Sequence, residues 1–247
     1  MIRSKQGVLG LCAMALGVIA VSATSAQAAF SWLVLDSSKS VATEVVLTGE
    51  GGTNLLAALT GEPDSADLSL LTELNGLEIA VTCTNFTLLN FSLEAHGKLS
   101  TGGRTIFTGC DAYKGGILGT NLGCVVKSPG APDGTIETNE LKGELALHAG
   151  AEVVVKILAL GTDIATLRFE ECELTEVNPL RGVIYINDGL AQATTHATRH
   201  LIEQHALTRI YLGSHNEKKL SKTKFDGSAW VELTGTHDNL DWSAMDM

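Results

Sequence analysis

Residues 141–158 read LKGELALHAGAEVVVKIL, and the spacing of their apolar side chains indicates the fold class. Leu141, Leu145 and Leu147 alternate with small or charged residues, which is the period of a β-strand with one buried face. Gly150 interrupts this alternation, and residues 153–157 resume it. The stretch therefore predicts two antiparallel strands that are joined by a turn around residues 149–151.

The same period recurs on both sides of this hairpin. Asn75-Gly76 predicts a tight hairpin turn, because both residues tolerate a positive φ. Residues 66–74 and 191–212 are compatible with either a helix or a strand. Residues 165–169 are expected to add a third strand to the hairpin, as a meander. The further strand candidates are residues 41–47, 77–83, 89–95, 183–186 and 229–233.

These patterns predict an all-β fold, either an antiparallel β-sandwich or a distorted barrel. The 26 glycines support short strands joined by tight turns. A β-solenoid is the alternative architecture, although the sequence shows no internal repeat of fixed period.

The N-terminus has the pattern of a cleavable signal peptide. Arg3 and Lys5 precede an uncharged apolar run at residues 8–23, and Ala26-Gln27-Ala28 supplies the small residues that signal peptidase accepts. The run is short for a membrane anchor, which needs about 20 apolar residues. We therefore expect a signal peptide over residues 1–28 and export of the mature chain to the periplasm or outside the cell.

The mature chain, residues 29–247, is expected to form a single β-rich domain. The loop at residues 127–134 is the best candidate for an internal boundary, because it is rich in proline and glycine.

Four cysteines follow the predicted leader: Cys83, Cys110, Cys124 and Cys172. An even number of cysteines in an exported chain predicts two disulfides, and four cysteines allow three pairings. We favour Cys110–Cys124, because the glycine-rich segment between them can fold back, which leaves Cys83–Cys172. A zinc site is not expected, since no C-x-x-C spacing occurs.

Charge and composition narrow the choice of partners. The chain holds 17 Lys and Arg against 28 Asp and Glu, a net charge of −11, which disfavours nucleic acid and anionic lipid. Aromatic residues make up 5% of the chain, and it ends in Asp246-Met247, which argues against an outer-membrane barrel. We expect no insertion of the mature chain into a membrane.

Several segments resemble a group of uncharacterised, exported, β-rich bacterial proteins. They are Gly109-Cys110, Gly123-Cys124, VVKSPG at residues 125–130, GTIETNELKGELAL at 134–147 and DGSAWVELTGTH at 226–237. The resemblance implies an all-β exported protein, and it transfers no activity and no site residue.

His196, His200 and Glu203 form the most suggestive polar group. On a helix all three share one face and could hold a metal ion, whereas on a strand Glu203 turns to the opposite face. The H-E-x-x-H order of zinc proteases is absent. We expect no metal and no cofactor here, and we expect both histidines to behave as ordinary surface residues.

The other candidates for catalysis are weaker. Glu170 and Glu171 are adjacent, so on a strand their carboxylates point to opposite faces and cannot act together. No G-x-S-x-G nucleophile motif occurs. The sequence therefore predicts no catalytic residue.

Two groups of residues are candidates for contact with an envelope polymer. Lys218, Lys219, Lys222 and Lys224 form a basic cluster that either binds an acidic polymer or is a solvated loop. Trp32, Trp230 and Trp242 are candidates for stacking on sugars. Trp230 is out of phase with its apolar neighbours, so it is expected to face outward or into a second layer.

The function predicted from the sequence is a non-catalytic structural or binding role for an exported, disulfide-stapled β protein. Its partner is expected to be an envelope polymer or protein. The alternative is a secreted hydrolase whose site has no recognisable motif.

Overall fold

The computed structural model describes residues 30–34, 45–46, 57–63, 68–74, 76–148, 152–174, 177–187, 197–213 and 220–246. Most of these residues belong to β-strands, and no α-helix occurs among them. The predicted leader, residues 1–28, lies outside the described ranges.

The strands follow one another closely along the chain. They are β1 Phe30–Val34, β2 Val45–Val46, β3 Ala57–Pro63, β4 Leu68–Leu74, β5 Leu77–Leu89, β6 Ser92–Glu94, β7 Lys98–Lys114, β8 Thr120–Asn121, β9 Val125–Lys127, β10 Thr135–Glu137, β11 Leu141–His148, β12 Glu152–Ala159, β13 Ala165–Glu170, β14 Val177–Asn187, β15 Arg199–Gln204, β16 Arg209–Gly213, β17 Leu220–Asp226, β18 Ser228–Leu233 and β19 Trp242–Asp246. Two single 3-10 turns, η2 Ala95–Gly97 and η4 Gly235–His237, complete the set.

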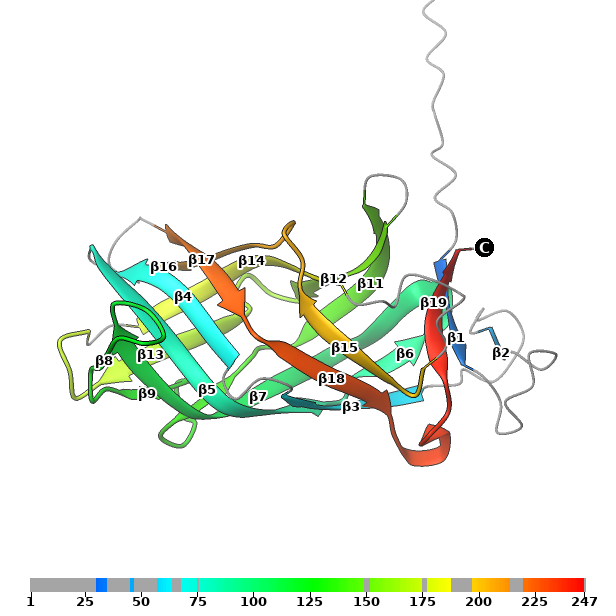
Figure 1. The fold of residues 1–247 in the computed structure, drawn as a ribbon, viewed down its shortest axis with the longest axis horizontal. Helices are drawn as coiled ribbons and strands as arrows, with labels where there is room; N and C mark the ends of the chain where they lie inside the picture. The colour runs from blue at the N-terminus through cyan, green and yellow to red at the C-terminus, as the bar shows by residue number, and fades with distance from the viewer. Residues whose placement is uncertain are drawn as a thin grey trace, which may run out of the picture.

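Sixteen of these strands form one antiparallel sheet that closes on itself as an elongated barrel with eight walls (Figure 1). Several walls consist of two consecutive strands that lie end to end. The strand is interrupted between them, and both parts pair with the same neighbouring wall. In chain order the walls are β3–β4, β5–β6, β7, β10–β11, β12–β13, β14, β15–β16 and β17–β18. The last wall pairs with the first, and β8 and β9 lie outside this ring on β7 and β13.

This architecture confirms the prediction of an all-β antiparallel fold in its distorted-barrel form. The alternative of a β-solenoid is wrong, because neighbouring strands run antiparallel and the sheet closes into a ring. The predicted hairpin is also present, with β11 and β12 paired from Leu141↔Ala159 to His148↔Glu152. β4 and β5 form the second predicted hairpin, since Leu74 at the end of β4 pairs with Leu77 at the start of β5; Asn75 lies outside the described residues.

Three local expectations need correction. β13 is not the third strand of a meander, because it pairs with β14 and β9 and continues the line of β12. The predicted strand at 89–95 is broken at Asn90, whose φ of 57° ends β5 before β6 begins. The two segments that were open between helix and strand contain no helix where they are described: they form β4, β15 and β16, with a turn at residues 205–208 between the last two.

The alternation of side chains sends apolar groups into the barrel and polar groups outward. On β18, Ala229, Val231 and Leu233 are buried, while Trp230 is half-buried on the outer face under the guanidinium of Arg199, 5.2 Å from the ring centroid. The predicted outward position of Trp230 is therefore confirmed. The barrel interior is the apolar core of the protein.

A glycine on β7 allows two cross-strand residue pairs between β5 and β7 to face the barrel interior. Cys83 lies opposite Cys110, and Phe86 lies opposite Phe107, although positions three residues apart on a regular strand face opposite sides. Gly109 adopts a φ of 65°, a left-handed conformation that favours glycine. This local twist places Thr84 on the outside and lets both pairs face inward.

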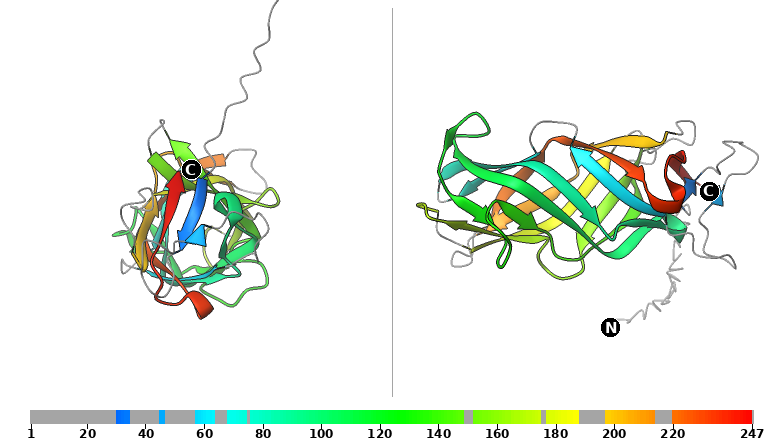
Figure 2. Two further views of the ribbon diagram at one scale, coloured as in Figure 1. Left: turned by 90° about the vertical axis from the view of Figure 1, so that its right-hand side faces the viewer. Right: turned by 90° about the horizontal axis from the view of Figure 1, so that it is seen from below.

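The second sheet closes one end of the barrel. β1 pairs with β19 and β2, and Figure 2 shows β1 and β19 lying across the barrel end. The indole of Trp32 donates to the carbonyl of Lys98 at 2.8 Å, and that of Trp242 donates to the carbonyl of Thr198 at 3.1 Å. We call this sheet the cap. Its two tryptophans tie it to the rim of the barrel.

Two disulfides join the four predicted cysteines, but the pairing differs from the favoured one. The bonds are Cys83–Cys110 and Cys124–Cys172. The glycine-rich segment does fold back, since β8 pairs with β7. Cys110, however, lies directly opposite Cys83 in the β5–β7 ladder. Cys124 precedes β9, whose first residue pairs with the last residue of β13, so it meets Cys172 instead.

Candidate functional site

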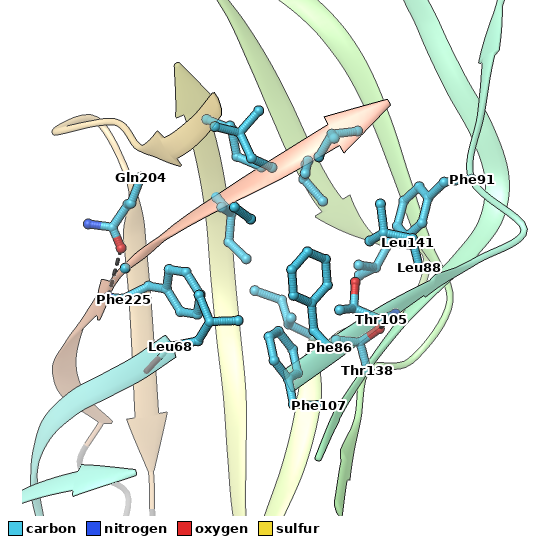
Figure 3. A pocket seen from close by; sticks show the side chains of 18 of the residues that line it. Leu68, Phe86, Leu88, Phe91, Thr105, Phe107, Thr138, Leu141, Gln204 and Phe225 are labelled. Atoms are coloured by element: carbon cyan, nitrogen blue, oxygen red, sulfur yellow. Dashed lines mark hydrogen bonds between the residues drawn. The ribbon is translucent and has the colours of Figure 1, made fainter. Parts of the chain in front are cut away.

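The barrel encloses a cavity of about 220 Å³. Its lining comes from all eight walls and from the cap, and nearly all of it is hydrocarbon. Figure 3 shows seven of the apolar side chains around it: Leu68, Phe86, Leu88, Phe91, Phe107, Leu141 and Phe225. A barrel of eight strands is just wide enough to be filled by side chains or to hold one small ligand. In this chain the inward side chains leave space unfilled.

Three phenylalanine rings line one side of the cavity. Phe86 and Phe107 are paired across β5 and β7, with ring centroids 6.2 Å apart. The ring of Phe225, from β17, lies 6.3 Å from that of Phe107 at an interplanar angle of 58°. Tilted rings at such distances are favourable aromatic contacts, so these three side chains support one another around the space.

Few polar side chains touch the cavity. Thr105 N donates to the hydroxyl oxygen of Thr138 at 2.8 Å, and Thr138 N donates to the carbonyl of Thr105 at 2.9 Å. These bonds close the wall where β10 meets β11. Glu203 is the one Asp, Glu, Lys, Arg or His among the described lining residues, and it is exposed to solvent.

The hydrogen-bond ladder between the β15–β16 wall and the β17–β18 wall is interrupted. β15 pairs with β18 as far as Glu203↔Ser228, and β16 pairs with β17 from Ile210↔Thr223 onward. We call the interval between them, residues 204–209 and 224–227, the seam. Residues 205–208 turn away towards β14, where Thr208 exchanges two hydrogen bonds with Tyr185.

A side chain bridges the seam. Phe225 N donates to Oε1 of Gln204 at 2.7 Å, so the glutamine amide stands in for a backbone acceptor (Figure 3). Gln204, Phe225 and Gly227 also line the cavity. Glu203, the neighbour of Gln204 on β15, is exposed to solvent.

The capped end is closed by aromatic contacts. The rings of Trp32 and Trp242 lie 5.9 Å apart, and both side chains line the cavity. Both are almost completely buried, with exposed fractions of 1% and 2%. The expectation that these two tryptophans stack on sugars at the surface is therefore wrong, because the cap turns them inward.

The predicted histidine group is only partly described. His196 lies outside the described residues. His200 and Glu203 lie on β15, where strand alternation places His200 inside and Glu203 outside, so they do not meet. His200 is buried, which corrects its expected surface position. Within the described ranges, no three His, Cys, Asp or Glu side chains are arranged to hold a metal ion.

Glu170 is a charged strand end, as predicted. Its carboxylate lies 2.8 Å from Lys127 Nζ on β9 and 3.4 Å from Arg168. The hydrogen bond from Lys127 lowers the pKa of Glu170, and the same bond raises the pKa of Lys127. Glu171 follows with a φ of 60° and is exposed. These charges link two strands on the outer surface.

Part of the predicted basic cluster lies on a β-strand. Lys218 and Lys219 lie outside the described residues, whereas Lys222 and Lys224 are exposed on β17. Lys224 pairs with Asp226 at 3.2 Å, so part of its charge is balanced. The expectation of a solvated loop is wrong for these two lysines, because β17 pairs with β16 and β4.

The cavity is the feature that the sequence did not predict. Its lining residues alternate like those of any half-buried strand, and the alternation gives no sign of whether the inward side chains fill the space. No helix in the described part of the chain is long and apolar enough to cross a membrane. Comparisons with protein-family models, with curated proteins and with solved structures find no match to this chain.

Proposed function

We propose that this protein is an exported, non-catalytic binding protein that holds a small apolar molecule inside its barrel. The observation that carries the proposal is the cavity of about 220 Å³, lined by hydrocarbon from all eight walls. Apolar cavities of about 150 Å³ are large enough for benzene. The space in this barrel therefore suits a somewhat larger ligand.

Export is supported by two features. Residues 1–28 have the pattern of a signal peptide. The two disulfides are of the kind that persists in oxidising compartments. A binding protein of this sort would work in the periplasm or outside the cell, where apolar molecules need a carrier in order to cross water.

The expected affinity is moderate. A ligand of about 15 non-hydrogen atoms that each contribute about −0.45 kcal/mol binds with a Kd of about 10 µM. The apolar lining supplies this energy by removing ligand surface from water.

The test is a titration with N-phenyl-1-naphthylamine, an uncharged dye that fluoresces in apolar surroundings. We expect saturable binding of one dye per chain. Thr105→Phe should weaken binding at least tenfold, because Thr105 lines the cavity and a phenyl ring would occupy it. Thr108→Phe is the matched control, since Thr108 is exposed on the same strand, and it should change the Kd less than twofold.

Equal binding by both variants would contradict the proposal. Circular dichroism would establish that each variant retains its β fold. Native mass spectrometry of the protein secreted by its own host gives a second readout, in which a mass excess that disappears on organic extraction identifies the bound molecule.

A further inference from the structure

The cavity has two sides that differ in their side chains. The phenyl rings of Phe86, Phe107 and Phe225 reach into the same space from β5, β7 and β17 (Figure 3). Ile184 of β14 and Ile202 of β15 also line it. In the ring of eight walls, β14 lies across from β5, and β15 lies across from β7. The space therefore lies between phenyl rings on one side and β-branched side chains on the other.

Several of these inward side chains are not fully covered by their neighbours. Phe107, Phe225, Ile184 and Ile202 are only half-buried, although all four line the interior. Protein interiors are ordinarily close-packed, so that inward side chains touch one another on every side. The uncovered area of these four side chains marks the part of the cavity where a further group fits between the two sides.

The three phenyl rings form a continuous aromatic surface. The ring centroid of Phe107 lies 6.2 Å from that of Phe86 and 6.3 Å from that of Phe225. The ring planes of the two pairs are tilted by 37° and 58°. Rings in such arrangements attract each other, because the positive edge of one ring meets the negative face of the other. A further ring beside the uncovered area of Phe107 would extend the same arrangement.

The two sides together favour an aromatic ligand over a saturated hydrocarbon of the same size. Both kinds of molecule gain from leaving water and from dispersion contacts with the lining. An aromatic ring gains in addition the attraction between ring edges and faces on the phenylalanine side. Its other face meets isoleucines, and aromatic groups pair favourably with β-branched side chains. The expected preference is about two- to tenfold in affinity.

We infer that the ligand carries an aromatic hydrocarbon ring, which binds between the three phenylalanines and the isoleucines of β14 and β15. Phe107 is the specificity-determining residue, because its ring contacts the other two and is itself half-buried against the cavity. This inference rests on the proposed function, since it names the chemical class of the molecule that the cavity holds.

The test compares ethylbenzene with ethylcyclohexane, which share one carbon skeleton and differ in the unsaturation of the ring. Binding is measured by the loss of each compound from the vapour above a solution of the protein. Each affinity is divided by the partition of the same compound from water into hexadecane, which removes the difference in hydrophobicity. With the unaltered protein, the ratio of the two corrected affinities should favour ethylbenzene at least twofold.

Variants on the two sides of the cavity separate the aromatic contact from the loss of volume. Phe107→Leu keeps the lining apolar and removes the central ring, so it should bring the ratio close to one while both compounds still bind. Ile184→Val is the matched control, because it removes a similar volume from the opposite side, and it should change the ratio less than 1.5-fold. Phe225→Leu repeats the test from another wall, and circular dichroism establishes that each variant keeps its β fold.

The outcomes distinguish this inference from the proposed function. A corrected ratio near one for the unaltered protein would overturn the assignment of an aromatic ligand. A preference that both Phe107→Leu and Phe225→Leu leave unchanged, or that Ile184→Val lowers equally, would overturn it as well. In each of these cases both compounds still bind, so the proposed function would stand. Failure of both compounds and of N-phenyl-1-naphthylamine to bind the unaltered protein would instead overturn the proposed function.

Discussion

The Nε2 atom of His200 lies 2.7 Å from the carbonyl oxygen of Trp242, and the two rings meet at a centroid distance of 4.3 Å. A carbonyl oxygen only accepts, so Nε2 carries the proton and donates. His200 belongs to the barrel wall, whereas Trp242 begins the last strand of the cap. The pair therefore joins the two sheets of the protein.

His200→Ala is expected to lower the free energy of unfolding by about 2 kcal/mol. The change removes a buried ring and leaves the buried Trp242 carbonyl without this donor. Urea unfolding followed by tryptophan fluorescence would measure it. His237→Ala is the control, because His237 is only half-buried on η4, and it should cost less than about 0.5 kcal/mol. Equal effects of the two substitutions would contradict the role of His200.

The ion pair between Lys127 and Glu170 predicts a defined pH dependence. The pKa of Glu170 is lowered below its ordinary 4.5 by the hydrogen bond from Lys127, so its contribution to stability is present above that value and is lost as the pH falls through the folded-state pKa. The pKa of Lys127 is raised above 10.5, so its contribution is present below that value and is lost as the pH rises through its folded-state pKa. Between about pH 5 and 10 the contribution should be constant.

An NMR titration of the Glu170 carboxyl carbon would check this shift. Lys127→Met should return its midpoint towards the ordinary value, because the largest cause of the shift is then gone. Lys142→Met is the control, since Lys142 is exposed on β11, and it should leave the midpoint in place. A Glu170 midpoint that Lys127→Met does not move would show that the bridge is absent in solution.

Non-reducing peptide mapping should find the links Cys83–Cys110 and Cys124–Cys172 and no free thiol at these positions. The bonds close sequence separations of 27 and 48 residues, which correspond to about 3.5 and about 4 kcal/mol in the chain-entropy account. Replacing either pair by alanine should therefore lower stability by amounts of this order. A peptide that links Cys110 to Cys124 would refute the pairing.

Gly109→Ala is expected to destabilise the barrel by more than the cost of a positive φ alone. A methyl group at Gly109 would collide with the hydroxyl of Thr84. Gly115→Ala is the matched control, because Gly115 also has a positive φ and its Cβ would meet nothing within 4 Å. We expect about 1–2 kcal/mol for the control and about 1 kcal/mol more for Gly109→Ala.

Adding Thr84→Ala to Gly109→Ala should recover most of that difference, since it removes the colliding oxygen. Thermal unfolding of the four proteins would decide the matter. A double variant that is no more stable than Gly109→Ala would show that Thr84 is not the obstacle.

The parts of the fold that depend on local periodicity were predictable. Leu141, Leu145 and the turn at residues 149–151 specify a hairpin without reference to the rest of the chain, and Asn75-Gly76 specifies another. The outward position of Trp230 follows from the same alternation. A half-buried strand carries this information in its own sequence.

The parts that depend on distant segments were not predictable. The glycine-rich segment between Cys110 and Cys124 would allow these two cysteines to meet. The long ladder between β5 and β7, however, places Cys83 directly opposite Cys110. His200 looked like a surface residue because its neighbours are polar, and it is buried only because β19 returns across the barrel end. The unfilled interior depends in the same way on how eight walls meet, which no single segment determines.

The cap limits the order in which the parts of the fold can form. β1 contains residues 30–34 and β19 contains residues 242–246, so the sheet over the barrel end joins two segments that are more than 200 residues apart in the sequence. During synthesis, the walls can pair while this end still stands open. The opening can be sealed only after residue 246 has emerged, so the interior stays accessible from this end until that point.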